Sequence, residues 1–457
     1  MPDPYVMIGG DAAGMSAASK IKRSLPDAEV IVFERSEHIS YSACGMPYWI
    51  AGVIESDRKL MILTPERARE RRGIDVRIGH EVTEIDPAAQ TVTVRRLATG
   101  ETLVQPYTKL VIATGASAAR PPIPGLALPG VFTLRALADG QRIFRYIAEA
   151  QPTRAVIIGG GYIGVEVAEA LRDRKLAVTL VEMLPQLLPN FDAEMVEEVT
   201  AHIAEQGVQV LTEQRVNAIT DAGDHLQVVL ANGETLPCEL VIVATGVRPN
   251  SELAAAAGLK LGKTGAIWVD AHMRTSDPHI YAAGDCVEHY HIVLGENAWI
   301  PLATSANKGG RIAGDNISGN PSTFPGIAGT AIVKVFDYTV ATTGLTEAQA
   351  RGSGKWGNEG ERMASTVVSA WEKAGYWPGA EKIKVKLVYT QESGRILGGQ
   401  LVGKAGVNKR IDIIATALSV GMTVDTLGML DLSYAPPYSP TYDPVQVCAN
   451  VAARGTE

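Results

Sequence analysis

Cysteine is scarce in this chain, with four in 457 residues and no C-x-x-C pair. This scarcity excludes a disulfide framework and gives no zinc-site pattern, and the His-x-His at 289–291 has no further candidate ligand, so we expect no metal. Long apolar runs are also missing: no stretch reaches the ~18 residues of a membrane-spanning helix, and the first residues do not resemble a signal peptide. We therefore expect a cytoplasmic protein with no membrane partner.

An excess of positive charge is absent as well. The sequence has 42 Lys and Arg against 50 Asp and Glu, a net charge of -8, which argues against nucleic acid as a partner. The hydrophobic fraction of 46% indicates a chain that can bury several cores, and its length predicts two to four domains.

A glycine-rich turn follows a short apolar strand at two places. The first unit has a strand at residues 5–8, the turn at 9–14, a helix at 15–23 and a strand at 29–33 that ends at Glu34. Glycines in such a turn let the backbone approach a pyrophosphate, the helix start supplies oriented N–H groups, and the acidic residue can bind ribose hydroxyls. The unit therefore predicts a dinucleotide site.

The second unit repeats this order, with a strand at 155–158, a turn at 159–164, a helix through Arg172 and a strand at 177–181 that ends at Glu182. One such turn is a weak signal, and the first copy lacks its middle glycine, but two complete copies are hard to obtain by chance. Residues 110–115, 240–246 and 280–285 each contain a further apolar strand that is followed by a short turn.

With these units the chain resembles the flavin-dependent pyridine nucleotide-disulfide oxidoreductases over essentially its whole length. The resemblance implies an α/β fold with two Rossmann-like domains, the NAD domain inserted in the FAD domain, and a C-terminal α+β dimerisation domain. The expected boundaries are 1–117 with 245–322 for FAD, 118–244 for NAD(P)H and 323–457 for the interface of a homodimer.

The family's cofactor residues carry over to the matching positions. Gly9, Gly14, Glu34 and Asp285 would serve FAD, and Gly159, Gly161, Gly164 and Glu182 the nicotinamide nucleotide. Further cofactor contacts are expected at Asp11, Ala13, Arg35, Ser42, Thr114, Gly115, Tyr162, Ile163, Gly246, Gly284 and Ala303. Glu182 favours NADH, because a carboxylate bonds the ribose 2′-hydroxyl and repels the 2′-phosphate of NADPH, which stays the alternative.

Cys44 is the candidate redox centre. A partner cysteine would lie at position 48 or 49, but the chain has Tyr48 and Trp49 there, so one thiol must act alone. The peroxidases and NADH oxidases of the family place a histidine in the first glycine turn, where this chain has Ala12. The branch that remains resembles the coenzyme A-disulfide reductases and their persulfide- and polysulfide-reducing relatives. We expect a helix start near Gly45 to lower the pKa of the thiol.

The same branch implies proton donors from the other subunit, namely Tyr434 and Tyr376 with Tyr438 beside them, so that the active site is complete only in the dimer. The same resemblance implies that a coenzyme A nucleotide would be bound by Ser16, Lys20, Arg23, Ser40, Arg72 and Arg311. Ala43 stands where the branch usually has asparagine, which leaves smaller disulfides, persulfides and polysulfide open as substrates.

Two other functions stay open. One is an NADH oxidase in which O₂ is the acceptor and Cys44 cycles through sulfenic acid. The other is a flavoprotein that senses redox state or binds a partner. A Cys44→Ser variant separates them, since a reductase should lose disulfide turnover and keep flavin reduction by NADH.

Overall fold

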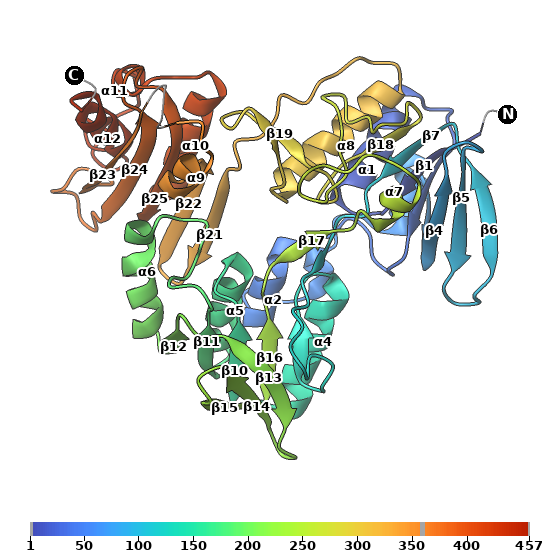
Figure 1. The fold of residues 1–457 in the computed structure, drawn as a ribbon, viewed down its shortest axis with the longest axis horizontal. Coiled ribbons are helices and arrows are strands. Elements are labelled where there is room, and N and C mark those ends of the chain that lie inside the picture. Colours follow the sequence, from blue (N-terminus) through green and yellow to red (C-terminus); the bar gives the residue numbers. More distant parts are fainter. Residues whose placement is uncertain (1–2, 357–361, 456–457) are drawn as a thin grey trace.

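The computed structural model describes residues 3–356 and 362–455. It consists of three parts, each built on its own sheet (Figure 1). The first glycine turn belongs to the part at the upper right, the second turn to the part at the bottom, and the C-terminal residues form the part at the upper left. In the part of the chain that the structure describes, no helix is long and apolar enough to cross a membrane.

A five-stranded parallel sheet is the centre of the first part, in the order β18-β7-β1-β2-β3. Its strands are nearly continuous apolar runs, as expected where both faces of a parallel sheet are covered. The chain segments that form this part contain β1 (Tyr5–Ile8), α1 (Ala12–Ser24), β2 (Val30–Glu34), the 3₁₀ helix η1 (Ala43–Gly45), α2 (Met46–Ala51), the 3₁₀ helix η2 (Asp57–Leu60), α3 (Pro65–Arg72), β3 (Asp75–Ile78), β4 (His80–Asp86), β5 (Thr91–Arg96), β6 (Thr102–Pro106), β7 (Lys109–Ile112), α7 (Glu252–Ala256), β18 (Ile280–Ala282), β19 (His289–His291), β20 (Glu296–Ala298) and α8 (Ala303–Ile317). Of these, α2 reaches into the bottom part, where it packs against α4 and α5.

Helices α1 and α8 pack tightly against each other, although they are far apart in sequence. Two glycines of α8 make this approach feasible, because a Cβ on Gly310 would lie 2.2 Å from the carbonyl oxygen of Ala13 and one on Gly314 2.8 Å from that of Ala17. The close contact fixes the first helix over the sheet and aims its N-terminus at the glycine turn.

The second part has its own parallel sheet, in the order β12-β11-β10-β16-β9. A three-stranded antiparallel sheet (β13-β14-β15) lies next to it, and the crossover pair β8 and β17 leads back to the first part. The elements are β8 (Ala116–Ala118), β9 (Val131–Thr133), α4 (Leu137–Ala150), β10 (Arg154–Ile158), α5 (Tyr162–Asp173), β11 (Ala177–Val181), α6 (Ala193–Glu205), β12 (Val208–Leu211), β13 (Val216–Asp221), β14 (Leu226–Leu230), β15 (Thr235–Cys238), β16 (Leu240–Val243) and β17 (Val247–Pro249).

The third part is an antiparallel sheet, β21-β22-β25-β24-β23, with α10 packed on β25 and β22 and α12 on β23 and β24. Its elements are β21 (Ala331–Val335), β22 (Tyr338–Gly344), α9 (Glu347–Gly352), β23 (Met363–Trp371), β24 (Lys382–Thr390), β25 (Ile396–Gly403), α10 (Val407–Ser419), α11 (Val424–Gly428) and α12 (Pro444–Ala453).

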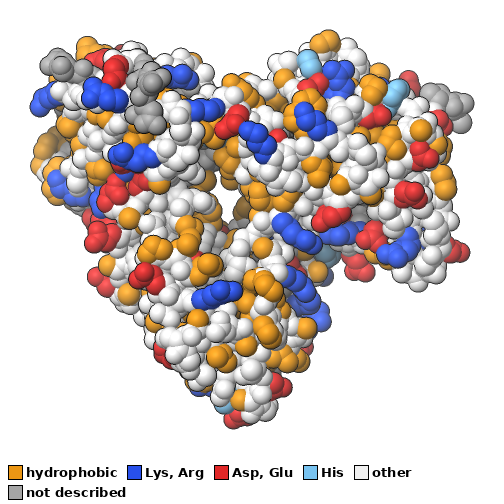
Figure 2. Space-filling model, viewed as in Figure 1, with side chains coloured by type: hydrophobic (Ala, Val, Ile, Leu, Met, Phe, Trp, Pro, Cys, Tyr) orange, Lys and Arg blue, Asp and Glu red, His pale blue; other side chains and the backbone are white. Residues whose placement is uncertain are grey.

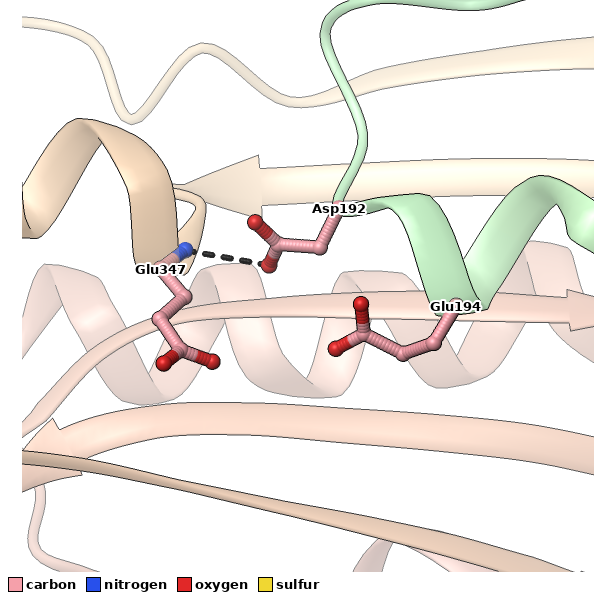
Figure 3. Close-up of side chains that lie close together, drawn as sticks. All are labelled: Asp192, Glu194 and Glu347. Carbon is pink, nitrogen blue, oxygen red and sulfur yellow. Dashed lines mark hydrogen bonds between the residues drawn. The ribbon is translucent and has the colours of Figure 1, made fainter. Parts of the chain in front are cut away.

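A buried ion cluster joins the second part to the third. Asp192 and Glu194 lie at the start of α6 and Glu347 at the start of α9, where a backbone N–H of Glu347 donates to Asp192 (Figure 3). Their carboxylate oxygens lie within 4.8 Å of one another. The ammonium of Lys386 on β24, only 1% exposed, sits among them and pairs with all three, so the cluster holds a lysine rather than a metal ion.

The predicted helices and strands occur close to their expected bounds. The first helix is longer than the predicted 15–23, beginning at Ala12, because Asp11 already occupies the N-cap position. Strand β18 pairs with β7, so residues separated by the whole second part share one sheet. The predicted domain boundaries stay a prediction.

Candidate functional site

A cavity of about 3260 Å³ runs between the parts and is lined by both glycine turns and by Cys44. Figure 2 shows the hollow on this face between the upper right part and the other two, with Lys and Arg side chains along its edge. Its volume is several times that of a pocket for one drug-sized ligand, which suits two dinucleotides. Most of the predicted cofactor residues line it: Gly9, Asp11, Ala13, Glu34, Arg35, Ser42, Thr114, Gly115, Gly159, Gly161, Tyr162, Ile163, Glu182, Gly246, Gly284, Asp285 and Ala303.

The two remaining predicted glycines lie behind the cavity wall, where they allow the helix to approach the turn. A Cβ on Gly14 would lie 1.9 Å from the carbonyl oxygen of Gly9, and one on Gly164 would lie 2.0 Å from that of Gly159. Gly9 and Gly159 themselves have φ of +108° and +110°, a conformation that favours glycine. Both helix starts are thereby presented to the cavity, which is the arrangement that a dinucleotide pyrophosphate requires.

The two acidic residues have matching hydrogen bonds. Glu34 accepts from the backbone N–H of Gly10 and of Ser36, each at 2.8 Å. Glu182 accepts from Gly160 at 2.7 Å and Leu184 at 2.8 Å in the same way. Each carboxylate thus ties its glycine loop to the end of the strand and keeps free lone pairs for ribose hydroxyls. These donor sets fit FAD and a nicotinamide nucleotide.

Asp285 lies on the opposite wall and is paired with an arginine that the sequence analysis missed. Arg135, between β9 and α4, donates to Asp285 at 2.7 Å and to the carbonyl oxygen of Ala116 at 3.1 Å. Burial raises the pKa of Asp285, and Arg135 opposes that shift. Burial also raises the pKa of Asp11, to about 6. Burial therefore disfavours the charged form of both aspartates.

Asn250 is a second missed residue, at the crossover between the parts. It accepts from Ser117 at 2.7 Å and donates to the carbonyl oxygen of Thr114 at 2.8 Å. Thr114 in turn donates to the carbonyl oxygen of Asn250 at 2.6 Å. This reciprocal pair holds the predicted Thr114–Gly115 turn in place.

Cys44 is exposed in the cavity, while Cys238, Cys286 and Cys448 are buried. It lies in η1, immediately before α2, so the predicted helix start is confirmed. The expected lowering of its pKa is wrong. Although the residue is open to the cavity, the surrounding protein still desolvates the thiol and this burial raises its pKa; Glu166 raises it further, and Arg135 opposes both. Helix α2 has only six residues, so its field does not outweigh a nearby carboxylate.

Glu166 was not predicted, although helical spacing could have indicated it. It follows Tyr162 by four residues on α5, and residues four apart share a helix face. The Tyr48 hydroxyl donates to Glu166 at 3.4 Å. Burial raises the pKa of Glu166 to about 7, so the carboxyl group facing the thiol can exchange a proton near neutral pH.

Of the predicted substrate residues, only Ser40 lines the cavity. Lys20 pairs with Asp315 at 2.7 Å, Ser16 donates to Asn307, and Arg72 donates to Ser19, all within the first part. Arg23 and Arg311 are exposed. Their predicted roles stay predictions, and the bonded ones would have to exchange partners to reach a ligand.

The predicted tyrosines lie in the third part, outside the cavity of their own chain. Tyr376, Tyr434 and Tyr438 are 77%, 50% and 78% exposed. A hydrogen bond with Tyr434 raises the pKa of Tyr376. The two phenols therefore lie together on an open surface, and their predicted role as proton donors stays a prediction.

The family model described as pyridine nucleotide-disulphide oxidoreductase matches residues 3–310, and the dimerisation-domain model of that family matches residues 330–444. The chain belongs to this family. Membership confirms the predicted fold, the C-terminal dimerisation domain and an oxidoreductase that uses FAD and a pyridine nucleotide.

Three relatives are similar over nearly the whole chain. The NAD(P)H coenzyme A polysulfide/persulfide reductase of Pyrococcus horikoshii is 39% identical, over 99% of this chain and 98% of that protein. The structure of a NAD-dependent persulfide reductase from A. fulgidus is 43% identical, with a TM-score of 0.94 over 99% of this chain and 83% of that one. An NADH oxidase of Methanocaldococcus jannaschii is 36% identical over 98% of both.

Proposed function

We propose that this protein is an NAD(P)H-dependent reductase of low-molecular-weight disulfides, with coenzyme A disulfide, persulfide or polysulfide as substrate. The observation that carries the proposal is one exposed thiol, Cys44, in a cavity shared by two dinucleotide turns, while the other three cysteines are buried. The relatives named as a coenzyme A polysulfide/persulfide reductase and a persulfide reductase are 39% and 43% identical, which supports this substrate class.

The chemistry begins at the sulfur of Cys44. The thiol loses its proton and attacks one sulfur of the substrate R–S–S–R′, so that a Cys44–S–S–R bond forms and R′–S⁻ leaves and takes up a proton. Two electrons from NADH then cleave this mixed disulfide, R–S⁻ leaves with a second proton, and the Cys44 thiol is regenerated. The sum is NADH, H⁺ and R–S–S–R′ giving NAD⁺, R–SH and R′–SH; R′ is hydrogen for a persulfide.

The residues around the thiol have separate tasks. The first glycine turn, Glu34 and Asp285 would hold FAD, which would supply the transfer of two electrons from hydride to sulfur. Tyr162, half-buried beside the second turn, lines the cavity and would pack against the bound cofactors. Glu166 takes the proton from the Cys44 thiol, since the raised pKa of that thiol requires a base, and the Tyr48 hydroxyl orients Glu166 by donating to its carboxyl group.

A homodimer would complete the site. The exposed phenols of Tyr376, Tyr434 and Tyr438 would enter the partner's cavity and donate protons to the leaving thiolates. The match to a dimerisation domain over residues 330–444 and the high exposure of these side chains support this arrangement.

Intact mass of the non-reduced protein, before and after reduction, tests the proposal. A loss equal to coenzyme A or to whole sulfur atoms on reduction, absent from Cys44→Ser, is expected. Turnover of coenzyme A persulfide with NADH should vanish in Cys44→Ser, while reduction of ferricyanide by NADH survives. Equal rates of disulfide turnover in wild type and Cys44→Ser would refute the proposal.

NADH oxidation by O₂ is the second candidate, because the M. jannaschii relative carries that name. Ala12 lies in the first turn where the oxidases of the family have histidine, which counts against it. Oxygen uptake that exceeds disulfide turnover, with an oxygen-sized mass on Cys44, would favour this function.

A further inference from the structure

Arg215 lies beside the end of β11, although it is distant from that strand in sequence. The backbone N–H of Gln214 donates to the carbonyl oxygen of Glu182 at 3.0 Å, and that of Glu213 donates to Leu184 at 3.0 Å. These two bonds clamp the segment before β13 against the segment that follows β11. Arg215 is the next residue, so the fold places it next to the acidic residue of the second dinucleotide turn.

The guanidinium of Arg215 is available for a ligand. Arg215 lines the cavity and is exposed. Within residues 3–356 and 362–455, its side chain has neither a hydrogen bond nor an ion pair. The guanidinium of Arg135, by contrast, is already paired with the carboxylate of Asp285. An unpaired guanidinium in a nucleotide cavity is suited to a phosphate, which it can bind with two parallel N–H bonds.

The carboxylate of Glu182 repels a phosphate less strongly than its full negative charge suggests. Its side chain is 6% exposed, and each carboxylate oxygen already accepts a backbone N–H, from Gly160 and Leu184. These donors hold the charge within the loop and offset part of it. The expectation that the carboxylate alone selects NADH therefore leaves out the cation next to it.

We propose that Arg215 binds the 2′-phosphate of NADPH, so that this protein uses NADPH as well as NADH. The inference rests on the proposed function only in taking the second glycine turn as the nicotinamide nucleotide site. Arg215 is a specificity-determining residue in this scheme, since NADH has no group for it to neutralise.

Binding of adenosine fragments tests the proposal without any disulfide chemistry. Calorimetry on the holoenzyme would compare 2′,5′-ADP with 5′-AMP for wild type, Arg215→Ala and Arg145→Ala. Arg145 is an exposed arginine on α4 that does not line the cavity and so controls for lost charge. A lost charge-assisted pair should weaken 2′,5′-ADP by about tenfold to a hundredfold, with 5′-AMP and the control unchanged. Added salt should reduce the difference in 2′,5′-ADP affinity between wild type and Arg215→Ala, because salt screens the charge interaction.

Coenzyme kinetics supply the second readout. With ferricyanide as acceptor, Arg215→Ala should lower kcat/KM for NADPH by the same factor and leave that for NADH within about twofold, and Arg215→Lys should be intermediate. Equal losses for both coenzymes would assign Arg215 to stacking on adenine and overturn the proposal, as would a wild type that does not bind 2′,5′-ADP more tightly than 5′-AMP. A protein that passes these tests but reduces no disulfide would refute only the proposed function.

Discussion

Replacement of Lys386 by methionine should destabilise the junction between the second and third parts. The ammonium lies 2.9 Å from Asp192 and 2.8 Å from Glu347, and it also bonds Glu194. Burial lowers the pKa of Lys386, but the three carboxylates outweigh burial and raise it overall. Methionine has a similar length and no charge, so the variant leaves three carboxylates facing one another (Figure 3).

Removal of one partner from a buried ion pair costs about 3–5 kcal/mol. The low end is expected here, because Asp192 keeps its bonds from Gln400 and the N–H of Glu347, and Glu194 is 49% exposed and can turn to water. A loss of about 3 kcal/mol lowers Tm by roughly 3 °C if a chain of this length unfolds as one unit, given an unfolding entropy of about 2.1 cal/mol/K per residue.

Calorimetry at pH 7 measures this loss, with Lys384→Met as the matched control. Lys384 lies on the same strand, is 24% exposed and pairs with Glu198 at 3.4 Å, so its loss should stay below about 1 kcal/mol. The pKa of Glu347 is held at about 2, despite burial, by Lys386 and Arg351. Its stabilisation is complete above about pH 4.5 and is lost towards pH 2, so the difference between variant and wild type should shrink over that range. Equal Tm values for Lys386→Met and wild type at pH 7 would refute the reasoning.

Three further outcomes are expected. Burial lowers the pKa of His289 to about 4, so its protonation favours unfolding and stability falls as the pH drops from about 6.5 to 4; His289→Leu should flatten that slope in thermal unfolding. Glu166→Gln should lower the pKa of Cys44 and speed its alkylation by iodoacetamide at neutral pH by roughly threefold to tenfold, and Glu169→Gln, whose carboxylate is paired with a lysine, should change the rate less. Tyr434→Phe should slow disulfide turnover by about a hundredfold or more while ferricyanide reduction persists, and an unchanged rate would exclude it as a proton donor.

Local patterns predicted the strands, the two turns and the thiol, because each depends on neighbours in sequence. An apolar run, a glycine at positive φ and an acidic residue at a strand end are all visible in a short window, and β1, β10 and β11 begin and end within a residue of the expected positions. The prediction that Cys44 acts without a cysteine partner was equally direct, since positions 48 and 49 hold tyrosine and tryptophan.

Residues that act across the parts could not be predicted in this way. Arg135 meets Asp285, and Lys386 meets Asp192, only after separate domains have packed. The raised pKa of Cys44 has the same origin in part, because burial raises it most and Glu166, which comes from the second part, raises it further. A sequence window near the cysteine contains the helix start but shows neither the burial of the thiol nor the opposing carboxylate, so the predicted sign of the pKa shift was wrong.

The matching bonds of Glu34 and Glu182 change what an acidic residue at a strand end indicates. Each carboxylate accepts a hydrogen bond from the backbone N–H of the second glycine in its turn, Gly10 or Gly160. The bond is the same in the turn expected to bind FAD and in the turn expected to bind the nicotinamide nucleotide. The glutamate is therefore needed to shape the loop before any ribose is bound, and its presence indicates a dinucleotide turn more firmly than it indicates a coenzyme. Selectivity must then depend on side chains that the fold adds from elsewhere, which is the role proposed for Arg215.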